Sequence, residues 1–327
     1  NIRSRVFGYE RGPVAIRYAV NKHNLVGNYT CKTVVEFLEL NSDMQFDVVV
    51  GNPPYQRPDA GKSTGASALY HLFVEKSKQI GKTIALIIPS RWFAGGKGLD
   101  EFRETMLNDV QIRKIVDYPN SDDCFQNVFV AGGVCYFIWE RDTNGDCVVV
   151  NRWEGKEAVS TRALNEFDKF VRFSPAVPVL KRVLSHQTGS FGDKISSRKP
   201  FGFPTNFKDF STEQFSGAVK IYGNHQVGWI ARDRVVVNTG WIDSWKVLIP
   251  AVGPNDSGIG KILAKPLVVE PNSCCTETYI VCGVFDTQQQ AENLAAYIRT
   301  RFFRFMVSLR KLTQHNPRDR FLWVPDL

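Results

Sequence analysis

Short apolar runs alternate with amphipathic stretches over about the first 140 residues of the chain. The apolar runs predict six strands, and the stretches between them predict three helices, each with apolar residues on one face. The predicted strands are Arg5–Glu10, Tyr29–Thr33, Phe46–Gly51, Thr83–Ser90, Ile112–Asp117 and Val130–Trp139, and the predicted helices are Gly12–His23, Leu69–Ile80 and Gly98–Asn108. Strands that alternate with helices in this way predict a doubly wound α/β sheet.

The pattern changes beyond about residue 160. Residues 161–183 predict a helical bridge that is broken at Pro175 and Pro178. Aromatic and glycine-rich segments follow, together with one long amphipathic helix at Thr287–Leu309, so we expect a mixed α+β second domain. Its predicted strands include Val219–Tyr222, Gly228–Arg232, Trp245–Pro250 and Pro266–Glu270. We therefore predict two domains, residues 1–180 and 181–327.

Composition places the chain among ordinary globular proteins. It has 327 residues, of which 43% are hydrophobic and 23% are charged. No apolar run approaches the roughly 18 residues of a membrane span, so we expect a cytoplasmic protein. The cysteines are seven, an odd number, and none forms a Cys-x-x-Cys pair. We therefore expect neither a disulfide framework nor a metal site.

Positive charge is concentrated in the second half of the sequence. Residues 180–327 contain 19 Lys and Arg against 12 Asp and Glu, whereas residues 1–179 contain 22 against 21. Such an excess favours an anionic partner, nucleic acid first. A generally solvated basic surface is the alternative.

The sequence Asn52-Pro53-Pro54-Tyr55 directly follows the predicted strand Phe46–Gly51. The two prolines fix the backbone and remove two amide donors, so the Asn52 side chain and the Pro53 carbonyl are left as rigid acceptors. Two such acceptors can take both hydrogens of a planar –NH2 group, return its lone pair to nitrogen, and so favour attack on a methylsulfonium. Tyr55 offers a face on which the ring can stack. The alternative is a simple turn at the end of a strand.

With these residues the chain resembles the gamma-class adenine-N6 DNA methyltransferases of restriction–modification systems. The likeness extends over most of the chain and is closest at Asn52–Tyr55, Ile88–Gly98 and Gly132–Phe137. It implies a Rossmann-like methyltransferase domain at residues 1–180, a DNA target-recognition domain at residues 181–327, and Asn52–Tyr55 as the catalytic motif. The implied reaction transfers a methyl group from S-adenosyl-L-methionine to adenine N6 in double-stranded DNA.

The resemblance also implies a site for S-adenosylmethionine. Glu10 ends the first predicted strand and would accept hydrogen bonds from the ribose hydroxyls, Glu36 and Phe37 would lie near the adenine ring, and Asn52 would border the methyl donor. The family's glycine-rich cofactor loop should precede Val6 and is not in this sequence. We therefore expect an upstream segment that completes the site.

Methylation of a base in a duplex requires that the base be flipped into an aromatic pocket. By resemblance, Phe125 is the second aromatic contact beside Tyr55. The cations Arg91 and Lys97 are predicted phosphate contacts near the site. In the second domain, polar glycine-punctuated loops suggest a further set of DNA contacts: Arg198, Lys199, Asn255 and Lys261.

Two other functions remain open from the sequence. The same turn could methylate a release-factor glutamine or a ribosomal RNA guanine, although a basic second half of about 150 residues argues against both. The chain could also be a non-catalytic subunit that binds DNA or a partner, such as a restriction endonuclease.

Overall fold

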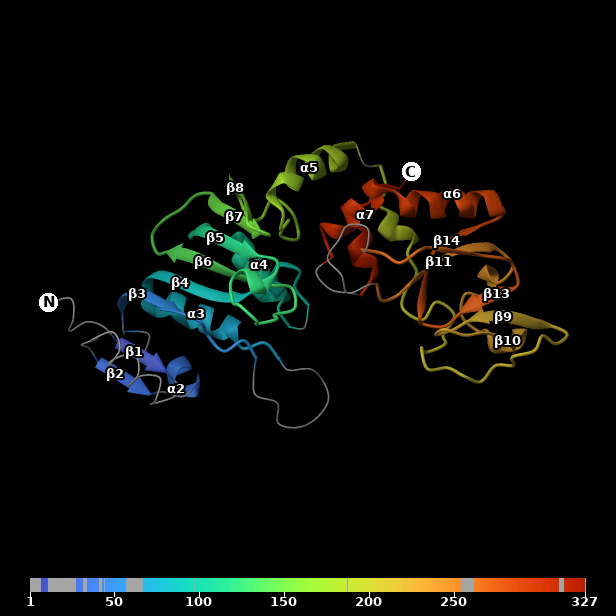
Figure 1. Ribbon diagram of the computed structural model, residues 1–327, viewed down its shortest axis with the longest axis horizontal. Coiled ribbons are helices and arrows are strands. Elements are labelled where there is room, and N and C mark those ends of the chain that lie inside the picture. The colour runs from blue at the N-terminus through green and yellow to red at the C-terminus, as the bar shows by residue number, and fades with distance from the viewer. Residues whose placement is uncertain are drawn as a thin grey trace. The chain divides into compact units, whose positions relative to one another are not determined.

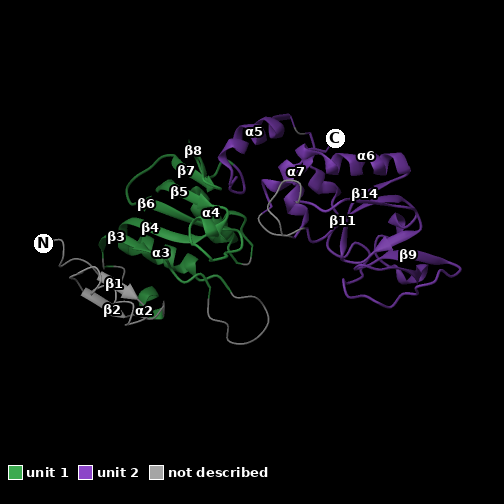
Figure 2. Cartoon of the chain, viewed as in Figure 1, with its two compact units in different colours: residues 1–166 green, residues 167–327 purple. Residues whose placement is uncertain are grey.

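The computed structural model describes residues 7–10, 28–31, 34–40, 43, 45–56, 67–96, 98–186, 188–253, 262–311 and 315–326. The chain divides into two compact units, residues 1–166 and 167–327 (Figures 1 and 2). The predicted boundary after residue 180 falls inside helix α5, Val177–His186. This helix belongs to the second unit because Val177 and Leu180 are buried in that unit's core.

Six strands of the first unit form one mixed sheet in the order β3-β4-β6-β5-β7-β8. Its strands are β3 (Phe46–Gly51), β4 (Gly81–Pro89), β5 (Ile112–Tyr118), β6 (Val134–Glu140), β7 (Cys147–Trp153) and β8 (Lys156–Arg162). β3 is parallel to β4 and β5 to β7, whereas β6 is antiparallel to both β4 and β5. The α/β class is confirmed. The sheet is mixed because β6 runs antiparallel between β4 and β5.

The first two described strands lie outside this sheet. β1 (Phe7–Glu10) and β2 (Asn28–Cys31) form a parallel pair of their own. They are followed by the short helix α2, Val34–Leu38. The predicted helix Gly12–His23 lies outside the described residues.

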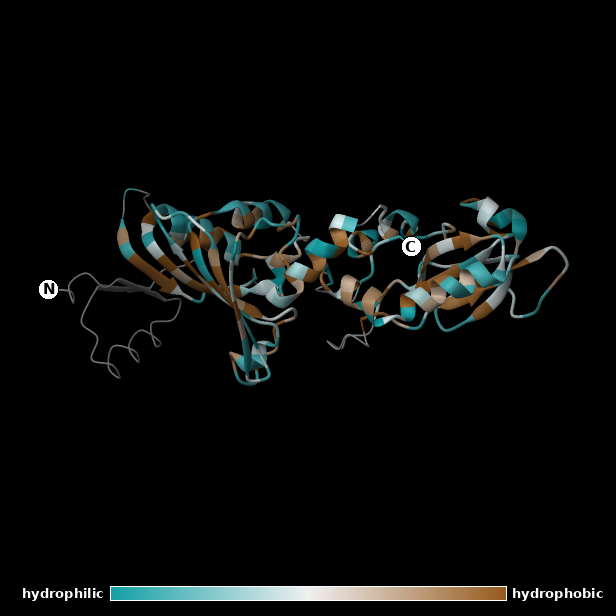
Figure 3. Cartoon of the chain, turned by 90° about the horizontal axis from the view of Figure 1, so that it is seen from above, coloured by the Kyte–Doolittle hydropathy of each residue, from teal (hydrophilic) through white to brown (hydrophobic). Residues whose placement is uncertain are grey.

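The helices α3 (Tyr70–Ile80) and α4 (Asp100–Asn108) cover the sheet with their apolar faces. Val74 and Ile80 of α3 and Met106 of α4 are buried, as the apolar spacing predicts. α3 packs beside β4, the strand that follows it in the chain (Figure 1). In Figure 3 the hydrophobic residues of both units gather on the strands.

The second unit contains two small sheets and two helices near its end. One sheet has the order β10-β9-β13 and the other the order β12-β11-β14. The strands are β9 (Ala218–Tyr222), β10 (Val227–Ala231), β11 (Trp245–Pro250), β12 (Leu267–Val269), β13 (Ser273–Cys275) and β14 (Tyr279–Phe285). The apolar residues of β11 divide between two cores, because Val247 packs toward the helices and Leu248 toward β9. The predicted mixed α+β character is confirmed.

Two helix predictions are wrong in detail. The predicted helix Thr287–Leu309 is two helices, α6 (Gln288–Arg299) and α7 (Arg301–Ser308). Thr300 separates them because its backbone is extended and its side chain accepts a hydrogen bond from the Phe303 amide, which caps α7.

The predicted helical bridge at residues 161–183 is also not formed as such. β8 continues to Arg162, and α5 begins at Val177 with Pro178 in its first turn. Proline is favoured there because the first-turn amides have no acceptor within the helix. Pro178 therefore starts this helix instead of breaking it.

Among the described residues, no helix combines the length and apolarity that crossing a membrane requires.

Candidate active site

Four chain segments reach the same edge of the six-stranded sheet. β3, β4 and β5 end there at Gly51, Pro89 and Tyr118, and β6 begins there at Val134. The register confirms this meeting, since Pro89 and Tyr118 both lie opposite Val134. Open α/β sheets bind their ligands at the carboxyl ends of their strands. The turn Asn52–Tyr55, which follows Gly51, therefore lies at the carboxyl ends of the strands, where sheets of this kind bind ligands.

The turn after β3 is held at both ends. Pro53 is buried, whereas Asn52 and Pro54 are exposed. Beyond the turn, Gln56 pairs with Ala68 in an antiparallel bridge, and the Leu69 amide donates to the Tyr55 carbonyl at 3.1 Å. The exposed Asn52 side chain is thus carried by a backbone that is fixed on either side.

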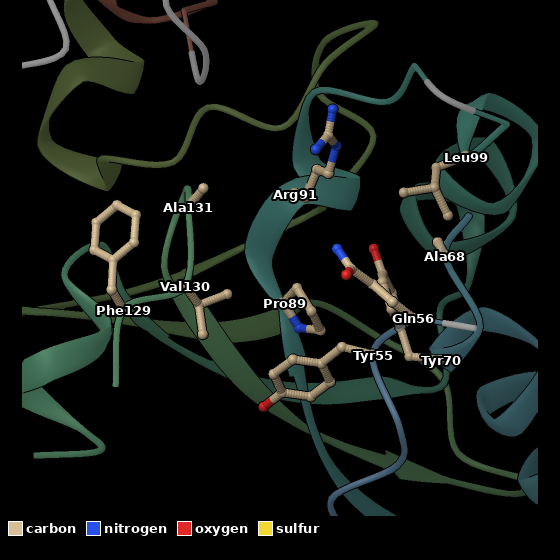
Figure 4. A pocket seen from close by; sticks show the side chains of 10 residues that line it. All are labelled: Tyr55, Gln56, Ala68, Tyr70, Pro89, Arg91, Leu99, Phe129, Val130 and Ala131. Carbon is tan, nitrogen blue, oxygen red and sulfur yellow. The ribbon is translucent and has the colours of Figure 1, made fainter. Parts of the chain in front are cut away.

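A pocket of about 400 Å³ opens beside this turn (Figure 4). Its walls come from the turn, from the start of α3, from the segment after β4 and from the loop between β5 and β6. The lining residues are Tyr55, Gln56, Ala68, Tyr70, Pro89, Arg91, Leu99, Phe129, Val130 and Ala131. Most of its lining residues are apolar or aromatic, and Gln56 and Arg91 add polar side chains, which is a usual set of residues for a small-molecule site.

Tyr55 presents its ring to the pocket and hides its hydroxyl. In Figure 4 the hydroxyl points away from Gln56 and Arg91. It is buried and has no hydrogen-bond partner among the described residues. Burial raises the pKa of Tyr55 to about 12, so the side chain is neutral at physiological pH. What Tyr55 offers a ligand is therefore its aromatic face.

The loop between β5 and β6 forms the opposite wall. The buried Ser121 hydroxyl donates to the Val128 carbonyl at 2.6 Å and accepts from the Val130 amide at 2.8 Å. Phe129 lies between these two anchors, lines the pocket, and is nevertheless 87% exposed. An exposed aromatic residue on a fixed loop is suited to stack against a bound ring.

Two further contacts fix the segments that carry the pocket. Gly133, at a φ of +80°, has no room for a side chain, because a Cβ atom would lie 2.1 Å from the Tyr118 carbonyl oxygen. The Gly133 carbonyl accepts from the Ser90 amide at 3.0 Å, and the Ser90 hydroxyl donates to Asp117 at 2.9 Å. The end of β4 is therefore tied to the start of β6, its neighbour, and to β5, the next strand beyond it.

The predicted residues near the turn divide into two groups. Tyr55 and Arg91 line the pocket, whereas Asn52 and Pro53 lie beside it on the same turn without being part of its lining. Phe125 is half-buried on the same loop as Phe129 and does not line the pocket. Sequence reasoning missed Gln56, Tyr70 and Phe129 as lining residues. A usable signal was the aromatic Phe129 just ahead of Gly132-Gly133.

The predicted cofactor residues lie on the separate first strands and on α2. Glu10 ends β1, and its side chain lies outside what the structure describes. Glu36 is exposed on α2, and the Phe37 ring stacks on Phe73 of α3 with 4.9 Å between ring centroids. A carboxylate and an aromatic ring are chemically able to contact a nucleoside with free hydroxyls, and the assignment of Glu36 and Phe37 to the cofactor stays a prediction. Among the described residues, no group of three His, Cys, Asp or Glu side chains could hold a metal ion.

Of the four predicted DNA contacts in the second unit, Arg198 and Lys199 are among the described residues. Arg198 forms an ion pair with the largely buried Glu277. Lys199 follows it with a left-handed backbone, at a φ of +57°, and the structure shows no ion pair for it among the described residues. Lys97, Asn255 and Lys261 lie outside the described residues.

Comparison with known proteins relates the first unit to one family. Residues 17–125 match the family model of the Eco57I restriction-modification methylase. An uncharacterized adenine-specific methylase of Mycoplasma pneumoniae is 32% identical over 141 residues, an alignment that covers 38% of this chain and 33% of that protein. The chain thus spans about one third of the relative's length.

Solved structures of restriction–modification proteins give weaker likenesses. The type IIL enzyme MmeI, solved in complex with DNA, has a TM-score of 0.48 at 11% identity, with 85% of this chain and 46% of that chain covered. The type IIG restriction endonuclease BpuSI has a TM-score of 0.44 at 12% identity, with 93% and 49% covered. The type I methyltransferase subunit from Streptococcus thermophilus has 0.35 at 16%, with 47% and 39% covered.

Proposed function

We propose that this chain is the catalytic part of an adenine-specific DNA methyltransferase of a restriction–modification system. One observation carries the proposal: the turn Asn52–Tyr55 leads directly into an aromatic pocket at the carboxyl edge of the sheet. That turn lies within residues 17–125, which match the methylase family model. The adenine-specific description of the Mycoplasma relative supports adenine as the base.

The turn acts on the amine. The Asn52 side-chain oxygen and the Pro53 carbonyl accept the two hydrogens of adenine N6, which draws the nitrogen lone pair out of conjugation. These contacts strengthen as the amine becomes tetrahedral, so they lower the barrier more than they tighten ground-state binding. Pro53 and Pro54 keep the two acceptors in place without amide donors that could compete.

Tyr55 holds the ring of the flipped base by stacking. A second aromatic wall comes from the loop between β5 and β6. The family resemblance assigns this wall to Phe125, whereas the pocket favours Phe129, which lines it and is exposed. We assign the stacking contact to Phe129 and an accessory role in shaping the loop to Phe125.

S-adenosylmethionine supplies the methyl group when it is bound. Glu10 and Glu36 would accept hydrogen bonds from hydroxyl groups of this cofactor, Phe37 would pack against it, and Asn52 would lie at the border between cofactor and base. The second unit would bind the target sequence in duplex DNA, and its candidate contacts are Arg198, Lys199, Asn255 and Lys261. In the first unit, Arg91 and Lys97 would contact the DNA near the pocket.

A methylation assay tests the proposal. The natural full-length protein is incubated with labelled S-adenosylmethionine and with duplex DNA, ribosomal RNA or release factor, and the methylated products are identified by mass spectrometry. We expect N6-methyladenine in DNA and its loss in the Asn52→Ala variant. Methylguanine in ribosomal RNA or methylglutamine in release factor would replace the proposal by one of those activities. DNA binding without any methylation would indicate a non-catalytic subunit.

A further inference from the structure

The pocket has two chemically different ends. In Figure 4 the ring of Tyr55 forms one end, the guanidinium group of Arg91 lies at the other, and the Gln56 amide lies between them. None of the described lining residues is acidic. Among them the one charged group is the Arg91 guanidinium, and neutral groups separate it from the aromatic end.

Arg91 is held in place but has no acceptor of its own. Its neighbours Ser90 and Trp92 are fully buried, so packing on both sides holds the backbone from which the Arg91 side chain extends. The Arg91 side chain makes no hydrogen bond or ion pair among the described residues, and its buried Nε has no partner there. A buried donor without an acceptor is costly, so a ligand that brings an acceptor is favoured.

Arg103 and Arg141, two other arginines of the same unit, donate hydrogen bonds through their terminal nitrogens, although the Nε of Arg103 is also without a partner among the described residues. Arg103 donates to the Ala94 carbonyl at 3.2 Å and to Asp100 at 2.7 Å. Arg141 donates to the Lys78 carbonyl at 2.6 Å and to the Gly81 carbonyl at 2.8 Å. Arg91 differs from them in the described part of the chain, and it is also the one that lines the pocket.

We propose that Arg91 binds the backbone phosphate of the flipped nucleotide and thereby positions its base against Tyr55. This inference rests on the proposed function. A nucleotide in DNA carries a planar ring at one end and a singly charged phosphodiester at the other, which matches the order of groups along the pocket. The planar fork of a guanidinium group suits two phosphate oxygens. Arg91 is thus a positioning residue, and the methyl transfer itself remains with the turn.

The experiment combines a protein variant with a DNA modification. Duplexes carry a neutral methylphosphonate at a single position, either beside the target adenine or several nucleotides away. In the wild-type protein, the modification beside the target should lower kcat/KM about ten- to a hundredfold, the range for a hydrogen bond to a charged group. The Arg91→Gln variant should show a similar loss on unmodified DNA and little further loss on the modified duplex, because both changes remove one interaction.

Two further variants serve as controls. Arg91→Lys keeps the charge without the planar fork and should retain part of the sensitivity to the methylphosphonate. Arg113→Gln removes a cation near the opposite edge of the sheet, where Arg113 donates to the Val110 carbonyl at 3.3 Å. It should respond to the modified DNA as the wild type does. The KM for S-adenosylmethionine should be unchanged in all of these variants.

Each outcome decides the inference. Equal sensitivity of wild type and Arg91→Gln to the methylphosphonate would overturn it. A raised KM for S-adenosylmethionine with an unchanged DNA profile would also overturn it and would assign Arg91 to the cofactor's carboxylate. If the wild type does not methylate DNA, the proposed function fails separately. The same duplexes are then compared by equilibrium binding, where Arg91→Gln must lose the preference for an intact phosphate.

Discussion

Both units pair cations with their own carboxylates, as Lys78 with Asp109 and Arg103 with Asp100 in the first unit, and the units differ in where an unpaired cation is found. In the first unit, Arg91 lines the pocket and has no ion pair among the described residues. In the second unit, which carries most of the net charge, at least eight cations lie in ion pairs with the unit's own carboxylates. These pairs are Lys169–Asp319, Lys194–Asp326, Arg198–Glu277, Lys220–Glu270, Arg232–Asp243, Arg234–Asp209, Arg310–Asp168 and Arg318–Asp193. Net charge therefore shows which unit is basic, but it does not show where charge is available to a partner.

Arg310 is the extreme case of a cation used for structure. It is 2% exposed, donates two hydrogen bonds of 2.8 Å to Asp168 and one of 2.8 Å to Asp319, and stacks on the Trp323 ring at 4.4 Å. These contacts join the start of the unit to its last residues. Such a residue adds to the predicted basic surface without being part of any surface.

The first prediction concerns this structural use of charge. Arg310→Met should lower the free energy of unfolding by about 3 kcal/mol, because it breaks a buried ion pair. This value is the lower end of the range for such pairs, since the two carboxylate partners are partly exposed and can be hydrated once the arginine is removed. The measurement is chemical denaturation followed by circular dichroism. Arg318→Met removes a cation whose pair with Asp193 is exposed, and it should cost less than about 1 kcal/mol. Equal losses would show that burial does not separate the two kinds of cation.

The second prediction concerns the turn of the first unit. Asn52→Ala should lower kcat by about a hundredfold or more, as expected for losing a contact that strengthens in the transition state, while DNA affinity stays within a few-fold. Asn144→Ala is the matched control, because Asn144 is exposed in the loop after β6 at the opposite edge of the sheet. Unchanged turnover in a folded Asn52→Ala protein would exclude the catalytic assignment.

The third prediction separates the two parts of Tyr55. Tyr55→Ala should lower kcat/KM roughly ten- to a hundredfold, because stacking of a base on an aromatic ring contributes about 1–3 kcal/mol. Tyr55→Phe should be close to wild type, because the hydroxyl points away from the pocket's polar groups and has no partner among the described residues. Steady-state kinetics on one DNA substrate would compare them. A loss in Tyr55→Phe as large as in Tyr55→Ala would mean that the hydroxyl, and not the ring face, contacts the substrate.

The smallest effect is expected for exposed cations of the second unit. Each phosphate contact contributes about −0.9 to the slope of log K against log salt, so Lys199→Ala should flatten this slope by about one and weaken all DNA sequences alike. Arg232→Ala should change it less, because Arg232 is already paired with Asp243. Titrations of duplex DNA at several salt concentrations give both slopes. If both variants flatten the slope equally, the internal ion pairs do not limit DNA binding.

Local patterns predicted the strand that leads to the Asn52–Tyr55 turn well. β3 has the predicted bounds, Phe46–Gly51, because an apolar run that ends at glycine and two prolines leaves little choice of structure. The long helix near the end was predicted less well, since its apolar stripe continues across Thr300 and hides the break there. Capping by Thr300 competes with helix continuation, and periodicity alone does not measure that competition.

Contacts between distant segments could not be predicted. The family resemblance pointed to Phe125 as the second aromatic wall, whereas the fold of the loop anchored by Ser121 places Phe129 in the pocket lining. The pairing of Arg198 with Glu277 joins residues far apart in the chain, so it too depends on the fold. Composition located the basic half correctly and could not distinguish its paired cations from its free ones.

The bridge between Gln56 and Ala68 has a consequence for how this protein tolerates change. Because these two residues are paired and the Leu69 amide is bound to the Tyr55 carbonyl, the intervening segment begins and ends at one place. Closing a longer loop between fixed ends costs only about 0.6 kcal/mol for each doubling of its length. Insertions at this point should therefore leave the neighbouring aromatic residues undisturbed. Segments of different length could therefore be inserted between Gln56 and Ala68 while the turn and the start of α3 keep their positions.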